Sequence, residues 1–410
     1  MTDMPLDLPT LKNDPDLKLA PAVFRTLVRI CAENWRYGTV TYILPSGRSI
    51  PIKGSEPGPH GVIRVHDYRF VGRAFRSGDI GFAEGYMAGE WDTPDLAALL
   101  TVFTLNFDRI TALVDGNPLM RAVNFVRHLL HANTRRGSAK NIHAHYDLGN
   151  AFYSRWLDPS MTYSSARFDK GAQTLEAGQR QKYAALAQTM ALSPGQTVLE
   201  IGCGWGGFAE FAAKERGAHV TGITISREQY DFARKRIFEA GLAERAQIKL
   251  IDYRDVDGQF DRVASIEMFE AVGEAYWPTY FRKVHDVLSP GGLATLQIIT
   301  IRDDLFAHYR SRADFIQKYI FPGGMLPSEE RLREETAKAG LRQDGLVRFG
   351  QDYADTLAEW ARRFESAWTE IRPLGFDERF RRLWKFYLAY CEAGFRTERT
   401  NVIQLGLARA

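Results

Sequence analysis

Apolar and polar positions change their spacing along the chain, and the first part of the pattern predicts a small mixed domain. A helical period of apolar residues runs from about Pro21 to Cys31. Three short β-branched runs separated by Pro/Gly turns then predict a small meander: Thr39–Leu44, Ile50–Lys53 and Val62–His66. The apolar run Leu96–Phe103 predicts a buried helix. We therefore expect an N-terminal α+β domain over residues 1–115, which begins with a polar tail.

A second pattern, in which strand-like and helix-like segments alternate, begins near residue 191. The strand-like runs are Thr197–Ile201, His219–Ile223, Gln247–Leu250, Arg262–Ile266 and Leu293–Ile298. Such alternation is typical of doubly wound α/β folds. Aromatic-rich helical stretches at 303–340 and 354–400 interrupt it, and Asn401–Leu407 predicts a closing strand. We expect one α/β domain over residues 145–410.

Between the two patterns, residues 116–144 are basic and partly amphipathic. Arg121, Arg127, Arg135 and Arg136 lie there, and no acid follows Asp115 within the segment. One interpretation is a solvated linker helix. The other is a helix that lies on anionic lipid headgroups. The segment alone favours neither.

The overall charge excludes some classes of protein. The 410 residues carry 53 Lys+Arg and 50 Asp+Glu, a net charge of +3, which argues against a protein that coats nucleic acid. No uninterrupted apolar stretch is long enough to span a bilayer, and the polar start does not resemble a signal peptide. We expect a soluble cytoplasmic protein that contacts membranes, if at all, from the inner surface.

Cysteine and histidine positions predict neither a disulfide framework nor a metal centre. The three cysteines, Cys31, Cys203 and Cys391, are too few and too scattered. The histidines His143, His145 and His219 lack metal-ligand spacing. We therefore expect no metal, and we interpret Cys203 as a packing residue.

The sharpest local signal is a glycine-rich loop between a strand and a helix. Thr197–Ile201 runs into Gly202, Gly204 and Gly206, where positive φ angles would let a ligand approach the backbone. Nicotinamide and flavin enzymes use similar loops, so the loop by itself leaves an oxidoreductase open. Glu200 argues against that alternative, because dinucleotide enzymes usually have an apolar residue there.

The sequence from Glu200 to Gly204 resembles motif I of the class I S-adenosylmethionine methyltransferases, in which the acid and glycines hold the amino acid moiety. The next strand ends without the acid that usually binds the ribose hydroxyls. Polar Thr224, Ser226 and Gln229 occupy that region instead.

Further blocks, in order from about 141 to 396, resemble the cyclopropane-fatty-acyl-phospholipid synthase and mycolic acid methyltransferase family. They are His145–Asn150, Leu157–Pro159, Met161–Ser164, Gly222–Ser226, Asp252–Arg254, Met268–Glu270, Tyr319–Pro327, Gln351–Tyr353 and Tyr390–Arg396. In the first domain the resemblance is weaker and rests on Gly81–Trp91.

This resemblance implies a class I methyltransferase fold with a seven-stranded sheet and helical insertions. It implies S-adenosylmethionine as cofactor, S-adenosylhomocysteine as product, and unsaturated acyl chains of membrane phospholipids as substrate. The default product is a cyclopropane fatty acid. Tyr163, Ser164, Asp252 and Tyr253 match further cofactor positions. The resemblance also implies that the first domain helps lipid capture and self-association, so that two copies of the chain could form a homodimer.

The resemblance also implies a base site, which is altered here. In the family a bicarbonate ion removes the proton, and Glu270 and Tyr353 match its site. Gln297 stands where the family has histidine, and Ser165 where it has cysteine; a backbone carbonyl near Ile299 completes the set. Glutamine cannot relay a proton as histidine does.

The altered base site leaves two alternatives open beside the cyclopropane. The cation could lose a different proton and give a methylated unsaturated chain, or an external reductant could quench it and give a methyl-branched chain. Alternatively, the protein could be a non-catalytic lipid-binding homologue. Gln179 and Lys182 also match family positions, although a solvated helix face explains Lys182 as well.

Overall fold

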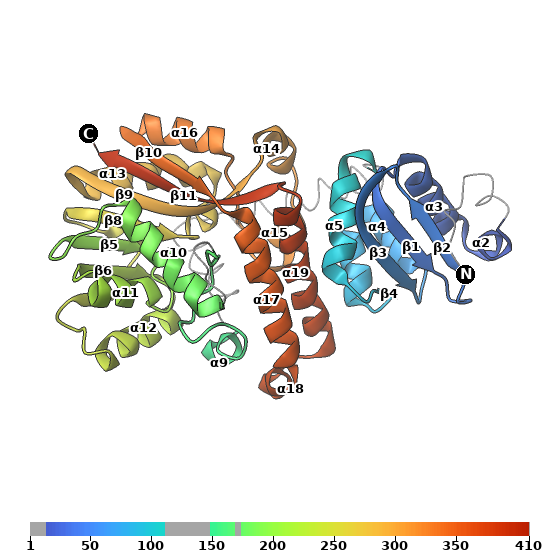
Figure 1. Ribbon diagram of the computed structural model, residues 1–410, viewed down its shortest axis with the longest axis horizontal. Helices are drawn as coiled ribbons and strands as arrows, with labels where there is room; N and C mark the ends of the chain where they lie inside the picture. Colours follow the sequence, from blue (N-terminus) through green and yellow to red (C-terminus); the bar gives the residue numbers. More distant parts are fainter. Residues whose placement is uncertain (1–13, 111–147, 169–173, 410) are drawn as a thin grey trace. The chain divides into compact units, whose positions relative to one another are not determined.

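The computed structural model describes residues 14–110, 148–168 and 174–409 and divides them into two compact units (Figure 1). The first unit holds the described residues up to 110 together with Ser311–Lys318 and Gly375–Thr397. The second unit holds the rest. The basic segment 116–144 lies outside the described residues, so both interpretations of it stay predictions.

The first unit contains a four-stranded sheet of order β2-β1-β3-β4. Its strands are β1 (Tyr37–Ile43), β2 (Ser49–Lys53), β3 (Glu56–Val65) and β4 (Trp91–Asp92). The predicted meander is wrong in its last pairing, because β3 runs parallel to β1 instead of pairing with β2. Gly54 makes this crossing possible, since a Cβ there would lie 2.2 Å from the carbonyl oxygen of Arg36.

Helices complete this unit, and one of them comes from late in the chain. They are α2 (Pro15–Leu19), α3 (Ala22–Asn34), α4 (Arg69–Met87), α5 (Leu96–Asn106) and α19 (Glu378–Arg396). The predicted helices near Pro21 and Leu96 are confirmed as α3 and α5. In α19, Arg382 donates hydrogen bonds to the carbonyls of Tyr86 and Trp91, which fixes α19 to the first unit.

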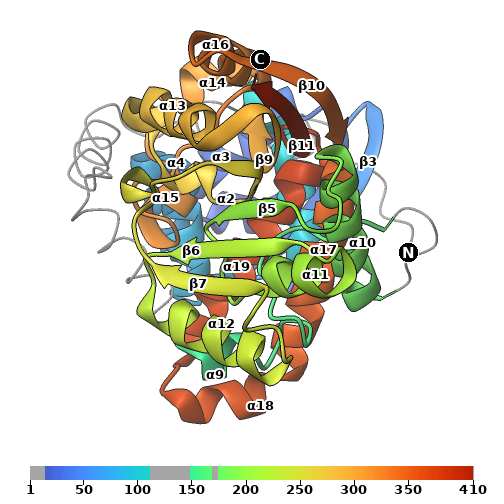
Figure 2. The same cartoon turned by 90° about the vertical axis from the view of Figure 1, so that its left-hand side faces the viewer.

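The second unit is a seven-stranded sheet of order β10-β11-β9-β8-β5-β6-β7 (Figure 2). Its strands are β5 (Thr197–Ile201), β6 (His219–Thr224), β7 (Ala246–Leu250), β8 (Phe260–Ile266), β9 (Leu288–Ile301), β10 (Leu341–Arg348) and β11 (Thr400–Arg409). Strands β5 to β9 are parallel, and β10 and β11 are antiparallel. The predicted α/β class and its six strands are confirmed, whereas β10 was not predicted.

Alternate side chains of the strands enter two different cores. Val198 packs in a cluster with α10 (Leu175–Thr189), α11 (Gly207–Glu215) and α12 (Arg227–Glu239). Its neighbour Leu199 packs in a second cluster with α13 (Trp277–Val287) and α16 (Glu329–Lys338). Helices therefore cover both faces of the sheet, as expected for parallel strands. Cys203 is buried in the first cluster, where burial raises the pKa of its thiol, consistent with a packing role.

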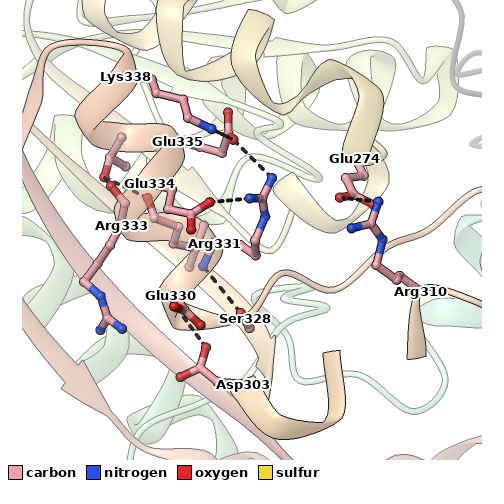
Figure 3. Close-up of polar contacts among 12 residues, drawn as sticks. Glu274, Asp303, Arg310, Ser328, Glu330, Arg331, Arg333, Glu334, Glu335 and Lys338 are labelled. Carbon is pink, nitrogen blue, oxygen red and sulfur yellow. Dashed lines mark hydrogen bonds and ion pairs between the residues drawn. The ribbon is translucent and has the colours of Figure 1, made fainter. Parts of the chain in front are cut away.

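The remaining helices carry the charged and aromatic insertions: α9 (Asn150–Tyr153), α14 (Asp303–Tyr309), α15 (Phe315–Tyr319), α17 (Gly350–Ser366) and α18 (Trp368–Ile371). Figure 3 shows the charged face of α16, where Arg331 pairs with Glu334 and Glu335 and Lys338 also pairs with Glu335. Because these charges pair with one another, we assign them to the stability of α16. No described helix is long and apolar enough to cross a membrane.

Candidate active site

The candidate site lies where the carboxyl ends of the parallel strands meet. Strand β5 is the first of the parallel strands, with β6 on one side and β8 on the other, so the order reverses between β5 and β8. In open α/β sheets ligands bind at such a reversal. Glu200 lies near the end of β5, and Glu267 follows β8 directly. Both carboxylates therefore belong to the edge at which a ligand is expected.

The glycine loop has the conformation that the sequence predicted. Gly202, Gly204 and Gly206 all have positive φ angles, of 79°, 53° and 83°. A Cβ on Gly202 would collide with Met268, whereas a Cβ on Gly204 would meet nothing within 4 Å. The loop therefore leaves open space above Gly204 at the start of α11.

Glu200 is only 2% exposed, and its Oε2 has no hydrogen-bond partner among the described residues. Burial raises the pKa of this carboxyl well above its ordinary value, and the charge of Lys182 opposes that rise. An unsatisfied buried carboxylate oxygen is costly unless a ligand completes it. Together with the open loop, it fits the amino acid moiety of the cofactor.

The polar residues after β6 form a compact cluster. Thr224 Oγ1 donates to Gln229 Oε1 across 2.9 Å, and Ser226 Oγ accepts from the Gln229 backbone N–H across 3.3 Å. The backbone N–H of Cys203 donates to the carbonyl of Ile223, so this cluster adjoins the glycine loop. The structure thus brings the predicted β5 and β6 residues together.

Asp252 and Tyr253 follow β7 as predicted, but their side chains make contacts of their own. Both carboxylate oxygens of Asp252 accept hydrogen bonds from the Arg254 guanidinium, at 2.8 and 2.6 Å. Tyr253 packs edge-on against Tyr280, and burial raises the pKa of its hydroxyl to about 12. Their assignment to the cofactor stays a prediction.

Tyr163 stands in an aromatic group. Its ring centroid lies 5.3 Å from that of Tyr153, 5.6 Å from that of Trp156 and 5.2 Å from that of Trp360. Trp156 and Trp360 are fully buried, but Tyr163 is only partly so. The group therefore presents an aromatic surface next to the segment that carries Ser164 and Ser165.

Two residues of α10 hold Ser164 in place by hydrogen bonds. Lys182 Nζ donates to Ser164 Oγ across 2.6 Å, and Gln179 Nε2 donates to the Ser164 carbonyl across 2.9 Å. The interpretation of Lys182 as part of a solvated helix face is wrong, because the side chain is 0% exposed. Through Gln179 and Lys182, α10 contacts the Ser164 segment, and the helix also packs against β9.

Three of the predicted base-site residues donate to Glu267, a carboxylate that the sequence did not single out. Tyr353 Oη donates to Glu267 Oε2 across 2.6 Å. Gln297 Nε2 and the backbone N–H of Ser165 donate to Glu267 Oε1, across 2.8 and 2.9 Å. Three hydrogen-bond donors favour the ionised form of this half-buried carboxylate, whereas its removal from water raises its pKa above the ordinary value.

Glu270 lies beside this group with a different environment. Its Oε1 accepts a short hydrogen bond from the Ile299 backbone N–H, and its buried Oε2 has no partner among the described residues. Burial and the nearby charge of Glu267 raise the pKa of Glu270 to about 8. The environment of Glu270 therefore favours its neutral form, while its neighbour accepts three hydrogen bonds. Two carboxyl groups with separated pKa values are a common basis for acid and base roles.

The donors to Glu267 are themselves held in orientation. Gln404 Nε2 donates to Gln297 Oε1 across 3.2 Å, which turns the Gln297 Nε2 toward Glu267. With Tyr353, Gln297 and Ser165 all donating to Glu267, the site does not fit a bicarbonate ion on the same donors.

Comparison with known proteins decides the family. Residues 133–405 match the family model "Mycolic acid cyclopropane synthetase". The chain belongs to this family. It is 41% identical over 352 residues to the tuberculostearic acid methyltransferase UfaA1 of Mycobacterium tuberculosis, covering 82% of this chain and 80% of that protein.

Two further relatives support the assignment. The cyclopropane-fatty-acyl-phospholipid synthase of Escherichia coli K12 is 35% identical over 388 residues, 93% of this chain and 95% of that protein. The crystal structure of the mycolic acid cyclopropane synthase CmaA1 complexed with SAH and CTAB has a TM-score of 0.62 and 28% identity, and covers 66% of this chain and 98% of that one.

This mycolic acid cyclopropane synthetase family member is an S-adenosylmethionine-dependent methyltransferase with the class I fold. The sequence resemblance and the predicted cofactor are confirmed. No group of metal-ligating side chains occurs among the described residues. Glu267, missed in the sequence, carried one usable signal, an acid at the carboxyl end of a strand next to β5. Gln404 carried none, because its contact depends on the antiparallel register of β11 with β9.

Proposed function

We propose that this enzyme methylates the double bond of unsaturated acyl chains in membrane phospholipids and that Glu267 then removes a proton. The observation that carries the proposal is the half-buried Glu267 carboxylate, with three donors, at the strand edge that also bears Glu200 and the glycine loop. The Escherichia coli relative is a cyclopropane-fatty-acyl-phospholipid synthase, and its name supports the choice of an acyl phospholipid as substrate.

Methyl transfer to an alkene requires a dry site that tolerates positive charge. The bound cofactor supplies an electrophilic methyl group on its sulfonium. The alkene donates its electron pair to that carbon, and the neighbouring chain carbon becomes cationic. The aromatic group of Tyr163, Trp156 and Trp360 can stabilise the cation through its ring faces and exclude water that would trap it.

Glu267 then accepts the proton. Its two oxygens are fixed by Tyr353, Gln297 and Ser165, and burial raises the pKa of the carboxyl above its ordinary value, which makes it a stronger base. The electron pair of the broken C–H bond neutralises the cation. Burial and the charge of Glu267 favour the neutral form of Glu270, which does not compete for the proton.

The origin of that proton sets the product. If it comes from the new methyl group, the electron pair closes a cyclopropane ring, which is the default product. A second product, a methylated unsaturated chain, arises if the proton comes from a chain carbon. The observation that raises this second product is the base itself, a protein carboxylate that occupies the donors Gln297 and Tyr353 in place of a bicarbonate ion.

The two products are isomers, so the test uses a cofactor whose methyl group carries three deuterons. Phospholipid vesicles with monounsaturated chains are incubated with enzyme and the fatty acids are analysed by mass spectrometry and NMR. A ring retains two deuterons and gives upfield ring signals, whereas loss of a chain proton retains all three. The absence of any label in the acyl chains would contradict the proposal and favour a non-catalytic lipid-binding protein.

We further propose that the enzyme reaches its substrate from the cytoplasmic surface of the membrane. Support comes from the basic composition of residues 116–144.

A further inference from the structure

We propose that Lys182 is a positioning residue of this reaction, whose buried ammonium group provides the counter-charge that keeps Glu267 ionised. This inference rests on the proposed role of Glu267 as the base. It assigns a task to a residue of α10 that touches neither of the carboxylates at the strand edge.

The position of Lys182 is unusual for a lysine. No other lysine or arginine is among the buried residues of the described ranges, and its side chain is 0% exposed. Burial of a charged amine is expensive unless nearby groups compensate it. Within the described residues its Nζ makes one hydrogen bond, to Ser164 Oγ, and lies 4.7 Å from the centroid of the Tyr183 ring.

Ser164 explains why the ammonium stays where it is. The Ser164 carbonyl is held by Gln179, and the next residue, Ser165, donates its backbone N–H to Glu267. On the other side, Gln404 donates to the backbone carbonyl of Lys182 and to Gln297, which also donates to Glu267. Lys182 is thus fixed at both ends to residues that orient the same carboxylate.

Charges from several elements act on this amine. Glu267 after β8, Glu200 on β5 and Asp158 after α9 favour its charged form, and burial opposes them and lowers the pKa of Lys182 to about 7. Other titratable or charged groups nearby are Tyr183 on α10, Arg236 on α12, which acts on Tyr183, and Arg167, which donates to Gln404.

The interaction is reciprocal. Burial raises the pKa of the Glu267 carboxyl, and the charge of Lys182 opposes that rise, as do the hydrogen bonds from Tyr353, Gln297 and Ser165. Removal of Lys182 should leave the three donors of Glu267 in place and yet make Glu267 harder to ionise. If Lys182 acted only as a hydrogen-bond donor to Ser164, its removal would not raise the pKa of Glu267 while the three donors stay in place.

The test measures the pH dependence of kcat at saturating cofactor for Lys182→Met and Lys182→Gln. Glutamine at this position can still donate a hydrogen bond to Ser164 but carries no charge. This variant provides the measurement if the methionine variant does not fold. The acid limb of kcat should move to higher pH by about one unit in both variants. Arg180→Met is the matched control: Arg180 lies on the exposed face of the same helix, paired with Glu215, and its loss should leave the limb unmoved. An acid limb that stays at the wild-type pH in a folded Lys182 variant overturns the inference.

A double variant separates this inference from the proposed function. If Lys182 acts through Glu267, Lys182→Met combined with Glu267→Gln should be no slower in kcat than Glu267→Gln alone. Multiplicative losses would overturn the role of Lys182 only. Wild-type kcat in Glu267→Gln would instead overturn the proposed role of Glu267.

Discussion

The hydroxyl of Tyr353 on α17 donates a hydrogen bond to Oε2 of Glu267, the residue that follows β8, across 2.6 Å. The backbone of Glu267 has φ +49°, a left-handed conformation that costs free energy for a residue with a Cβ. A strained backbone conformation of this kind persists only where the surrounding contacts hold the residue in it. Here the hydrogen bonds to Tyr353, Gln297 and Ser165 hold the side chain in place.

Replacement of Tyr353 by phenylalanine should slow the reaction without loss of the fold. A hydrogen bond to a charged group is worth about 1.5–3 kcal/mol, so kcat should fall about ten- to hundredfold. Because the lost donor favours the ionised form of Glu267, the pKa of that carboxyl should rise, and the acid limb of kcat should move to higher pH. Steady-state assays with labelled cofactor over a pH series provide the measurement.

Tyr230→Phe is the control for that experiment. It removes a hydroxyl that accepts a hydrogen bond from Arg234 on the exposed part of α12. Its kcat and pH profile should match those of the wild type. Equal pH profiles for the Tyr353 and Tyr230 variants would show that Tyr353 does not tune the base.

The glycine loop makes a prediction about cofactor binding. Alanine at Gly204 would place a methyl group in the open space above the loop, so the affinity for S-adenosylhomocysteine should fall about tenfold or more. Gly241→Ala is the matched control, because Gly241 also has a positive φ, of 69°, and an open Cβ position. Both variants should lose about 1 kcal/mol of stability. Calorimetric titration should show weakened binding in the Gly204 variant alone; weakening in both would mean that strain is responsible.

Stability should depend on pH through Glu270. The folded-state pKa of Glu270, about 8, lies above its ordinary value of 4.5, because burial and Glu267 disfavour the charged form. Its contribution to stability is therefore complete below about pH 4.5 and is lost as the pH rises to about 8. The Glu270→Gln variant has no carboxyl group to ionise and so does not lose this contribution. The free energy of unfolding of the variant minus that of the wild type should therefore increase from pH 4.5 to pH 8. Urea unfolding at both ends of the interval measures the difference, and a constant difference would refute the pKa assignment.

Part of this site could be predicted from the sequence and part could not. Glu200 and the glycines follow from a local strand–loop–helix pattern, because backbone conformation decides what they do. Glu267 and Lys182 needed the fold, because one follows β8 and the other lies on α10. Only the folded chain brings them to the neighbouring residues Ser165 and Ser164. Likewise, the pairing of β3 with β1 depends on a close backbone approach at Gly54 that hydrophobic alternation does not encode.

The basic segment 116–144 should strengthen binding to anionic vesicles. Raising the salt concentration should weaken that binding, because salt screens exposed charges beyond about 10 Å at 0.1 M. Substitution of Arg127, Arg135 and Arg136 by glutamine should reduce both the binding and its dependence on salt. Co-sedimentation with vesicles of increasing phosphatidylglycerol content measures this, and binding that is insensitive to salt would favour a simple linker.

The most direct test of the central claim is the dependence of product formation on bicarbonate. Glu267 occupies the donors of Tyr353, Gln297 and Ser165, so the wild-type enzyme should methylate monounsaturated phospholipid at the same rate in carbonate-depleted buffer as in buffer with added bicarbonate. Glu267→Gln should reduce that rate about a hundredfold or more in both buffers. A wild-type rate that collapses on depletion and returns with bicarbonate would contradict the assignment of Glu267 as the base.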